Sequence, residues 1–195
     1  MLFSENPRLV FIHVYKNAGT SIRRAFLKAG LQDEAAVRGL ASHATAAEVI
    51  RQIGAEAFNS YHSFAVVRNP WDWQVSLYRY ALEKPNHHQH EMVKQMGSFE
   101  VYLDWRCREE VRLQKGFVAD VDGVILVNRL IRFENLTDEF NSLCRDLGIT
   151  ASLPHLNASS RSRWQDCYDA RTFDLVKKTF AEDIELFGYG DCGLS

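Results

Sequence analysis

The sequence predicts an α/β fold, with a parallel central sheet flanked by helices, formed as a single domain over residues 1–195. Short apolar runs rich in β-branched residues alternate with segments of helical periodicity, which is typical of such a sheet. Two of these runs lead directly into a helix start. The length suits one domain that buries roughly 70% of the surface its unfolded chain exposes.

The first strand and helix are expected close to the N-terminus. Arg8–Val14 (RLVFIHV) is a short apolar run suited to a buried strand. A helix follows from Ser21 to about Lys28, and Gly30 is placed to end it. Thr45 and Glu48 then have the spacing of a capping box, which predicts a further helix start.

A second strand is expected at Ser63–Arg68 (SFAVVR). Asn69 and Pro70 follow it as a helix N-cap and a proline at the first helical position. The helix they start is expected to end at Pro85, because proline cannot continue a helix.

The remainder of the chain predicts further helices and at least one strand. A helix is expected from Phe99 to about Arg106, and a strand within Val124–Leu136. The next apolar helical stripe ends at Gly148. Apolar residues at helical spacing over Phe173–Phe187 predict one last helix before Gly188.

Composition is that of an ordinary globular protein, with 46% hydrophobic residues and a formal net charge of −2. This balance argues against a nucleic-acid coat or a polybasic membrane anchor. No signal peptide and no transmembrane run is evident, so a cytoplasmic protein is expected. The four cysteines lie far apart without a C-x-x-C motif, so no zinc site is expected; they are Cys107, Cys144, Cys167 and Cys192. They are expected to be reduced thiols, and a pairing of Cys167 with Cys192 is the alternative.

The stretch VYKNAGTS, residues 14–21, has the character of a phosphate-holding turn between a strand and a helix. The usual P-loop places its lysine after the last glycine, whereas Lys16 precedes Gly19 here. Gly19 lets backbone approach an anion, and N–H groups at a helix start attract negative charge. Thr20 and Ser21 are suited to capping the helix and donating hydroxyl groups to the anion at once, and the alternative is that they only cap the helix.

The second anion motif is VVRNPWDWQVSLYRY. Arg68 stands at the end of a strand, and Ser76 lies about two helical turns further on. Arginine forms bidentate contacts with phosphate and serine adds a donor, although an Arg-Asn-Pro turn is also common loop chemistry. Ligands of parallel sheets bind at the carboxyl ends of the strands, so Lys16 and Arg68 are expected to share one site.

These two motifs resemble those of the sulfotransferases that use 3′-phosphoadenosine 5′-phosphosulfate (PAPS). FIHVYKNAGTSI resembles their 5′-phosphosulfate loop, and FAVVRNPWDWQVSLYRY resembles their 3′-phosphate motif. The likeness is closest to the carbohydrate 2-O-sulfotransferase-like branch and its soluble bacterial relatives, and it extends through RFENL and LPHLNASS to AEDIELFGYG. It implies a P-loop-like sulfotransferase fold and an enzyme that transfers a sulfuryl group from PAPS to an acceptor hydroxyl, without a metal.

The resemblance also implies residue roles. Lys16 would stabilise the leaving phosphate, and Arg68 with Ser76 would bind the 3′-phosphate. Trp73 stands where the family often has arginine, which puts a local ion pair with Asp72 in question. The residues that would hold the 5′-phosphosulfate are Lys16, Asn17, Ala18, Gly19, Thr20 and Ser21. A late loop would close over the nucleotide with Asn157, Ser160 and Arg161. The polarity of these three residues is explained equally well by an ordinary loop.

Histidine is the usual general base for a hydroxyl near neutral pH. His43, in the loop LASHATAAE, matches the position of the catalytic base in the resembling branch; the alternative is an ordinary loop residue. His13 is expected to be packed, while His62 is open to either a buried or a surface position. The remaining histidines favour solvated loops or turns over a metal site; they are His87, His88, His90 and His155.

Two other functions are weighed against sulfuryl transfer. A P-loop kinase using ATP lacks its Gly-Lys-Ser/Thr motif here, and Arg68 stands where an acidic Mg²⁺ ligand is expected. A non-catalytic nucleotide-binding module is the other alternative. The acceptor is expected to be a carbohydrate or another small alcohol or phenol, and Glu134 is expected to be structural.

Overall fold

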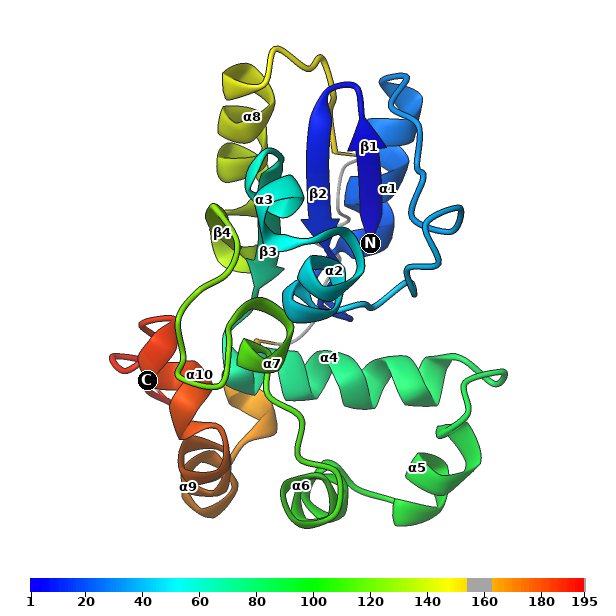
Figure 1. The fold of residues 1–195 in the computed structure, drawn as a ribbon. Helices are drawn as coiled ribbons and strands as arrows, with labels where there is room; N and C mark the ends of the chain where they lie inside the picture. The colour runs from blue at the N-terminus through cyan, green and yellow to red at the C-terminus, as the bar shows by residue number, and fades with distance from the viewer. Residues whose placement is uncertain (154–162, 195) are drawn as a thin grey trace. The chain divides into compact units, whose positions relative to one another are not determined.

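The computed structural model describes residues 1–153 and 163–194, which form two compact units (Figure 1). The first unit comprises Met1–Arg68 together with residues 114–153. The second comprises Asn69–Leu113 together with residues 163–194. Each unit is described separately below.

A four-stranded sheet lies at the centre of the first unit, in the order β1 (Leu2–Glu5), β2 (Arg8–Ile12), β3 (His62–Val67) and β4 (Arg129–Arg132). The strand pairs β2–β3 and β3–β4 are parallel, as the sequence predicts. Strand β1 runs antiparallel to β2 at the edge and was not predicted, because four residues are too few to show a periodic pattern.

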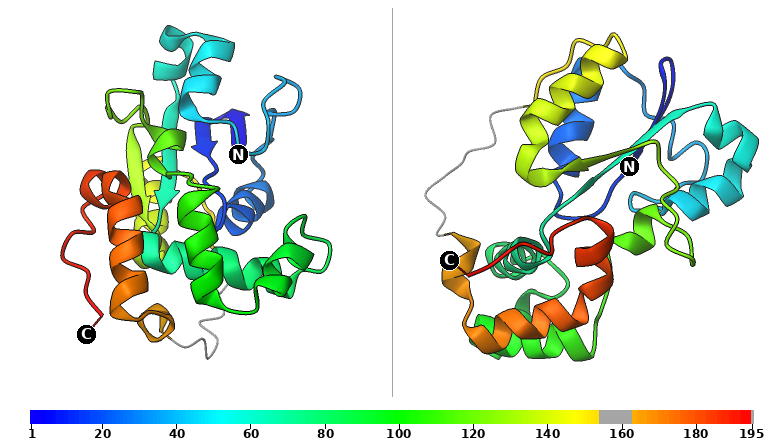
Figure 2. Two further views of the ribbon diagram at one scale, coloured as in Figure 1. Left: turned by 90° about the horizontal axis from the view of Figure 1, so that it is seen from below. Right: turned by 90° about the vertical axis from the view of Figure 1, so that its left-hand side faces the viewer.

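Helices cover both faces of this sheet, which confirms the predicted α/β class (Figure 2). One face carries α1 (Gly19–Lys28) and α8 (Leu136–Asp146). The helices on the other face are α2 (Ala46–Ile53), α3 (Ala55–Asn59) and α7 (Lys115–Val118). A 3₁₀ turn, η1 (Phe133–Asn135), joins β4 to α8.

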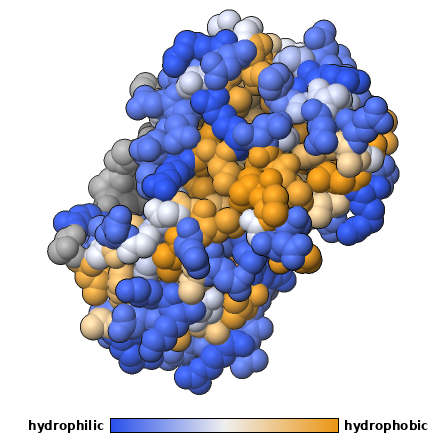
Figure 3. Space-filling model, turned by 60° about the vertical axis from the view of Figure 1, so that its left-hand side comes forward, coloured by the Kyte–Doolittle hydropathy of each residue, from blue (hydrophilic) through white to orange (hydrophobic). Residues whose placement is uncertain are grey.

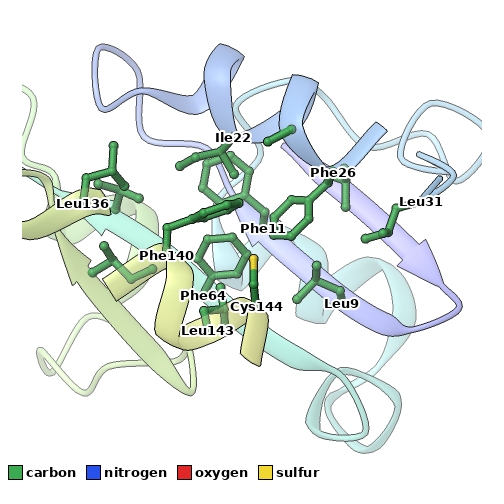
Figure 4. Packing of buried hydrophobic residues seen from close by; sticks show 14 residues of the cluster. Leu9, Phe11, Ile22, Phe26, Leu31, Phe64, Leu136, Phe140, Leu143 and Cys144 are labelled. Atoms are coloured by element: carbon green, nitrogen blue, oxygen red, sulfur yellow. The ribbon is translucent and has the colours of Figure 1, made fainter. Parts of the chain in front are cut away.

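An aromatic core holds α1 and α8 against the sheet (Figure 4). The rings of Phe11 and Phe64 on neighbouring strands stack with centroids 4.8 Å apart, and those of Phe26 and Phe140 on the two helices lie 5.1 Å apart. All four side chains are buried, and burial of one such side chain stabilises a fold by about 1.5–3 kcal/mol. This packing fixes the start of α1 just beyond the carboxyl end of β2.

The second unit is helical over its described residues, and it contains α4 (Pro70–Glu83), α5 (His90–Met96), α6 (Phe99–Arg108), η2 (Trp164–Cys167), α9 (Ala170–Thr179) and α10 (Ala181–Leu186). Trp71 stacks on Phe173 with ring centroids 4.5 Å apart, and its Nε1 donates a hydrogen bond to the Phe173 carbonyl oxygen at 3.1 Å. This contact ties α4 to α9.

The prediction of one last helix over Phe173–Phe187 is wrong. Helix α9 ends at Thr179, and Phe180, with φ −107° and ψ 26°, separates it from α10. The side chain of Phe180 is fully buried and meets the ring of Trp73 edge-on. The apolar spacing continues through the break because both helices pack against the same core.

The predicted helix boundaries of the capped helices are confirmed. Thr45 and Glu48 form the capping box of α2, and Asn69 accepts hydrogen bonds from the first backbone N–H groups of α4. Ser98 caps α6 in the same manner. Local side-chain chemistry therefore set these boundaries.

Hydrophobic and hydrophilic residues both reach the surface. Figure 3 shows one face on which an area of hydrophobic residues is bordered by hydrophilic ones. Apolar atoms make up much of the surface of any globular protein, so this mixture is ordinary. Among the described residues, no helix combines the length and the hydropathy needed to cross a bilayer.

Candidate functional site

The turn that follows β2 has an unusual backbone. Lys16 and Ala18 both lie in the left-handed region, at φ 64° and 60°, which non-glycine residues rarely adopt. Ala18 is the N-cap of α1, and no side chain caps this helix. The interpretation of Thr20 and Ser21 as capping residues is therefore wrong. The first N–H groups of a helix generally lack an intrahelical partner, although the Ser21 N–H of α1 donates to the Ala18 carbonyl oxygen at 2.9 Å. Alternating left- and right-handed residues form a concave set of N–H groups that suits an anion.

A buried hydrogen-bond network fixes this turn to the end of β3. Asn17 Nδ2 donates to the Val66 carbonyl oxygen and to Gln114 Oε1, both at 2.8 Å. Gln114 Oε1 also accepts from the Arg68 N–H at 3.0 Å, and its Nε2 donates to the Arg68 carbonyl oxygen at 2.8 Å. Arg68 Nη1 donates to the Lys16 carbonyl oxygen at 3.1 Å. Lys16 and Arg68 are thus in direct contact, and their sharing of one ligand site stays a prediction.

Arg68 is held in a defined position within the first unit. Its guanidinium carbon lies 4.0 Å from the centroid of the Phe133 ring, a cation–π distance. Ser76 lies half-buried on α4, which belongs to the second unit. The role of Arg68 and Ser76 at a 3′-phosphate stays a prediction.

His13 packs against the start of α1, as expected for a packed histidine. Its ring stands next to Gly19, where a Cβ atom would lie only 1.9 Å from two of the ring atoms. Burial, helped by nearby positive charges, lowers the pKa of His13 from 6.5 to about 3. His13 is therefore neutral at physiological pH.

His43 lies in the exposed loop before α2, with its ring centroid 4.4 Å from that of His13. Its Nδ1 is 2.9 Å from the His13 carbonyl oxygen. A carbonyl oxygen only accepts, so Nδ1 carries the proton of this hydrogen bond, and in neutral His43 the lone pair is on Nε2. The geometry gives His43 the tautomer that a base acting through Nε2 requires.

A cavity of about 680 Å³ lies beside the start of α1 in the first unit, and Lys16, Asn17 and Arg68 are not part of its lining. Its lining includes the start of α1 at Gly19 and Thr20, and it also includes His13 and His43. The charged side chains of its lining are those of Arg23, Arg24, Lys28 and Asp33. Such a volume is within the usual range for small-molecule sites.

The structure brings only some of the predicted residues to this site. Asn157, Ser160, Arg161 and His155 lie outside the described residues. His62 is exposed at the start of β3, at the opposite end of the strand from Arg68. Trp73 is fully buried and fills the core of the second unit instead of forming an ion pair of the kind an arginine would make.

Among residues 1–153 and 163–194, no group of three histidine, cysteine or acidic side chains is arranged to hold a metal ion. His90 is the first residue of α5, and its Nδ1 lies 2.8 Å from the Ala81 carbonyl oxygen. Within the part of the chain that the structure describes, the four cysteines are not joined in disulfides. Glu134 is exposed in η1.

Sequence reasoning missed Gln114 completely. Nothing in its neighbourhood, VRLQKGF, distinguishes it, and it is separated from Asn17 by 97 positions. Only the folded chain shows that its side chain contacts both anion motifs.

The site combines an uncapped helix start with a lysine and an arginine at the end of a mostly parallel sheet. This combination is typical of α/β proteins that bind phosphate-bearing ligands. Comparison with protein-family models matches the sulfotransferase family over residues 1–190. The chain therefore belongs to the sulfotransferase family, whose members are enzymes that generally use PAPS as the donor. Searches of curated proteins and of solved structures found no significant match.

Proposed function

We propose that this sulfotransferase transfers a sulfuryl group from PAPS to the hydroxyl group of a carbohydrate or another small molecule bound in the cavity beside His43. One observation carries the proposal: His43, whose Nε2 is free to accept a proton, lines the same cavity as the uncapped start of α1. The proposal therefore rests on a candidate base and a candidate anion site that line one cavity. These are the two parts that transfer to an alcohol requires.

The residues of the turn fit the 5′-phosphosulfate group. The left-handed residues Lys16 and Ala18 and the uncapped start of α1 supply N–H donors to an anion. Lys16 adds a positive charge, which we assign to the developing charge on the leaving phosphate. PAPS supplies the activated sulfuryl group, while Arg68 and Ser76 are assigned to its 3′-phosphate.

His43 is assigned the role of general base. An alcohol is a weak nucleophile until its proton is removed, and a positioned base contributes about 10²–10⁴-fold to the rate. The hydrogen bond from Nδ1 to the His13 carbonyl oxygen orients the ring and stabilises the imidazolium that forms when Nε2 takes the proton.

The lining of the cavity favours an acceptor with a negative charge. Three cationic side chains and one anionic side chain reach it, an excess of two positive charges. Arg23 is paired with Asp33 at 2.7 Å, which leaves Arg24 and Lys28 to provide the excess. Both lie on α1, one turn apart, and therefore on one face of the helix.

Neither alternative function explains the site as well. A kinase would present an acidic Mg²⁺ ligand near the end of β3, whereas Arg68 stands there and bonds to the turn. A non-catalytic nucleotide-binding module would not need a histidine whose tautomer is fixed in the cavity.

The test of cofactor class is a thermal-shift comparison of adenosine 3′,5′-bisphosphate, AMP and Mg-ATP. A ligand at a hundred times its Kd stabilises the folded state by about 2.7 kcal/mol, which gives a clear shift in Tm. We expect a shift with the bisphosphate much larger than that with AMP. Equal shifts with these two, or a shift with Mg-ATP alone, would overturn the proposal.

The test of acceptor class uses matched pairs with labelled PAPS: a hydroxybenzoate with its methyl ester, and a hexuronic acid with the neutral hexose. We expect the charged member of each pair to be the better acceptor. Arg24→Ala and Lys28→Ala should raise its KM, while Arg51→Ala on α2, away from the cavity lining, should not. Preference for the neutral members would contradict this assignment.

A further inference from the structure

Gln114 is the residue at which the chain returns from the second unit to the first. The chain leaves the first unit after Arg68. The side chain of Gln114 is fully buried, at 0% exposure. Although Gln114 is the N-cap residue of α7, its side chain does not cap that helix. The hydrogen bonds of this long, buried polar side chain are therefore made to residues outside α7.

Gln114 pairs with Arg68 as a neighbouring strand would. Its Oε1 accepts from the Arg68 N–H and its Nε2 donates to the Arg68 carbonyl oxygen, at 3.0 and 2.8 Å. Strand β3 ends at Val67, so this pairing fixes the backbone one residue beyond the strand. The direction in which the Arg68 side chain leaves the sheet depends on that backbone.

The same oxygen of Gln114 also holds the turn. Asn17 Nδ2 donates to it at 2.8 Å, and Asn17 lies between the two left-handed residues Lys16 and Ala18. Strained backbone of this kind persists only where the surrounding structure holds it. In the part of the chain that the structure describes, Asn17 Oδ1 has no hydrogen-bond partner, so the amide nitrogen alone anchors this side chain.

We propose that Gln114 is a positioning residue that fixes the 5′-phosphosulfate turn and the arginine of the 3′-phosphate motif in one register. It acts through Asn17 and through the Arg68 backbone, without contact to the nucleotide. The inference rests on the proposed function for the identity of the bound nucleotide, but the hydrogen-bond network itself does not.

The test compares Gln114→Met, which keeps the length and loses the hydrogen bonds, with Gln114→Glu, which keeps the acceptor and loses the donor. Removing one partner of a buried hydrogen bond typically weakens the equilibrium that depends on it by roughly a factor of ten. For Gln114→Met we expect the Kd of adenosine 3′,5′-bisphosphate, measured by calorimetry well below the Tm of the apo variant, to rise at least about tenfold. Gln114→Glu should lose at least as much affinity, because its buried negative charge faces the Arg68 carbonyl oxygen and lies beside the turn assigned to an anion.

A matched control is Asn128→Ala. Asn128 Oδ1 accepts from the backbone and hydroxyl of Ser63 at the opposite end of β3, so this variant removes a side-chain anchor of the same strand away from the turn. Its Tm should fall while its Kd for the bisphosphate stays that of the wild type. The KM for PAPS should rise in Gln114→Met and not in Asn128→Ala.

The possible failures are distinct. If the wild type does not prefer the bisphosphate over AMP, the proposed function fails. If the wild type shows that preference and folded Gln114→Met keeps its Kd and KM, the role of Gln114 is overturned and its network is structural only. If neither Gln114 variant folds, Asn17→Ala tests the same link from the other side, and unchanged affinity there would also overturn it.

Discussion

The imidazole ring of His13 occupies the space that a side chain at Gly19 would need: a Cβ atom there would lie 1.9 Å from Cδ2 and Nε2 of the ring. The same residue accepts the hydrogen bond of His43 through its carbonyl oxygen. His13 therefore both packs against the start of α1 and orients His43, the candidate base. This explains physically why residue 19 has no side chain.

Gly19→Ala should consequently be severe, because the ring must move before the methyl group fits. We expect it to abolish measurable binding of adenosine 3′,5′-bisphosphate, read by thermal shift. The double variant His13→Ala/Gly19→Ala should regain part of that binding, because the small side chain at residue 13 vacates the space. A double variant no better than Gly19→Ala would show that the contact is not the cause.

His43→Ala should reduce turnover at least about a hundredfold with little change in bisphosphate affinity, because a general base acts in the chemical step. His62→Ala is the control, since that exposed histidine lies at the start of β3, at the opposite end of the strand from Arg68. Near-normal turnover of His43→Ala would place the base elsewhere.

Arg68→Ala should weaken binding of adenosine 3′,5′-bisphosphate by roughly 1.5–3 kcal/mol, the usual range for hydrogen bonds to charged groups. AMP, which lacks the 3′-phosphate, should lose much less. Arg129→Ala on β4, where the arginine pairs with Asp146 at 2.7 Å, serves as the control. Equal losses for both nucleotides would mean that Arg68 supports the turn through Lys16 without contacting the 3′-phosphate.

Lys16→Ala should lower turnover strongly while much of the bisphosphate affinity remains, because we assign its charge to the transition state. Lys28→Ala should have the complementary effect, a higher KM for a charged acceptor with similar turnover at saturation. Single-turnover rates with labelled PAPS would separate the two. A Lys16→Ala variant with wild-type turnover would remove this lysine from the mechanism.

His13 should contribute to the acid sensitivity of the fold. Burial lowers its pKa in the folded state to about 3, below its ordinary value of 6.5. The unfolded chain therefore binds the proton more tightly between these values, and the free energy of unfolding falls as pH drops from 6.5 toward 3, by up to about 1.4 kcal/mol per pH unit. In His13→Gln, urea unfolding between pH 6.5 and 4.5 should show a slope smaller by up to that amount, and an unchanged slope would contradict this role of His13.

The sequence alone determined where the strand and the helix starts of the site lie. The apolar run before His13 and the Asn69-Pro70 pair are local signals, and the structure places a strand and a helix start there. The order of lysine and glycine between Val14 and Ser21 separated this turn from a P-loop. These features depend on residues within one or two helical turns of each other, so a linear pattern contains them.

Tertiary structure decided how these parts act together. The pairing of Gln114 with Arg68 and Asn17 joins positions separated by 46 and 97 residues, and no periodicity relates them. The tautomer of His43 depends on a carbonyl oxygen thirty positions earlier, and the low pKa of His13 depends on burial. The division of the last apolar stripe at Phe180 is likewise set by the core that both helices share. Hydrogen-bond partners and burial belong to the folded chain, because only folding brings distant groups out of water and into contact.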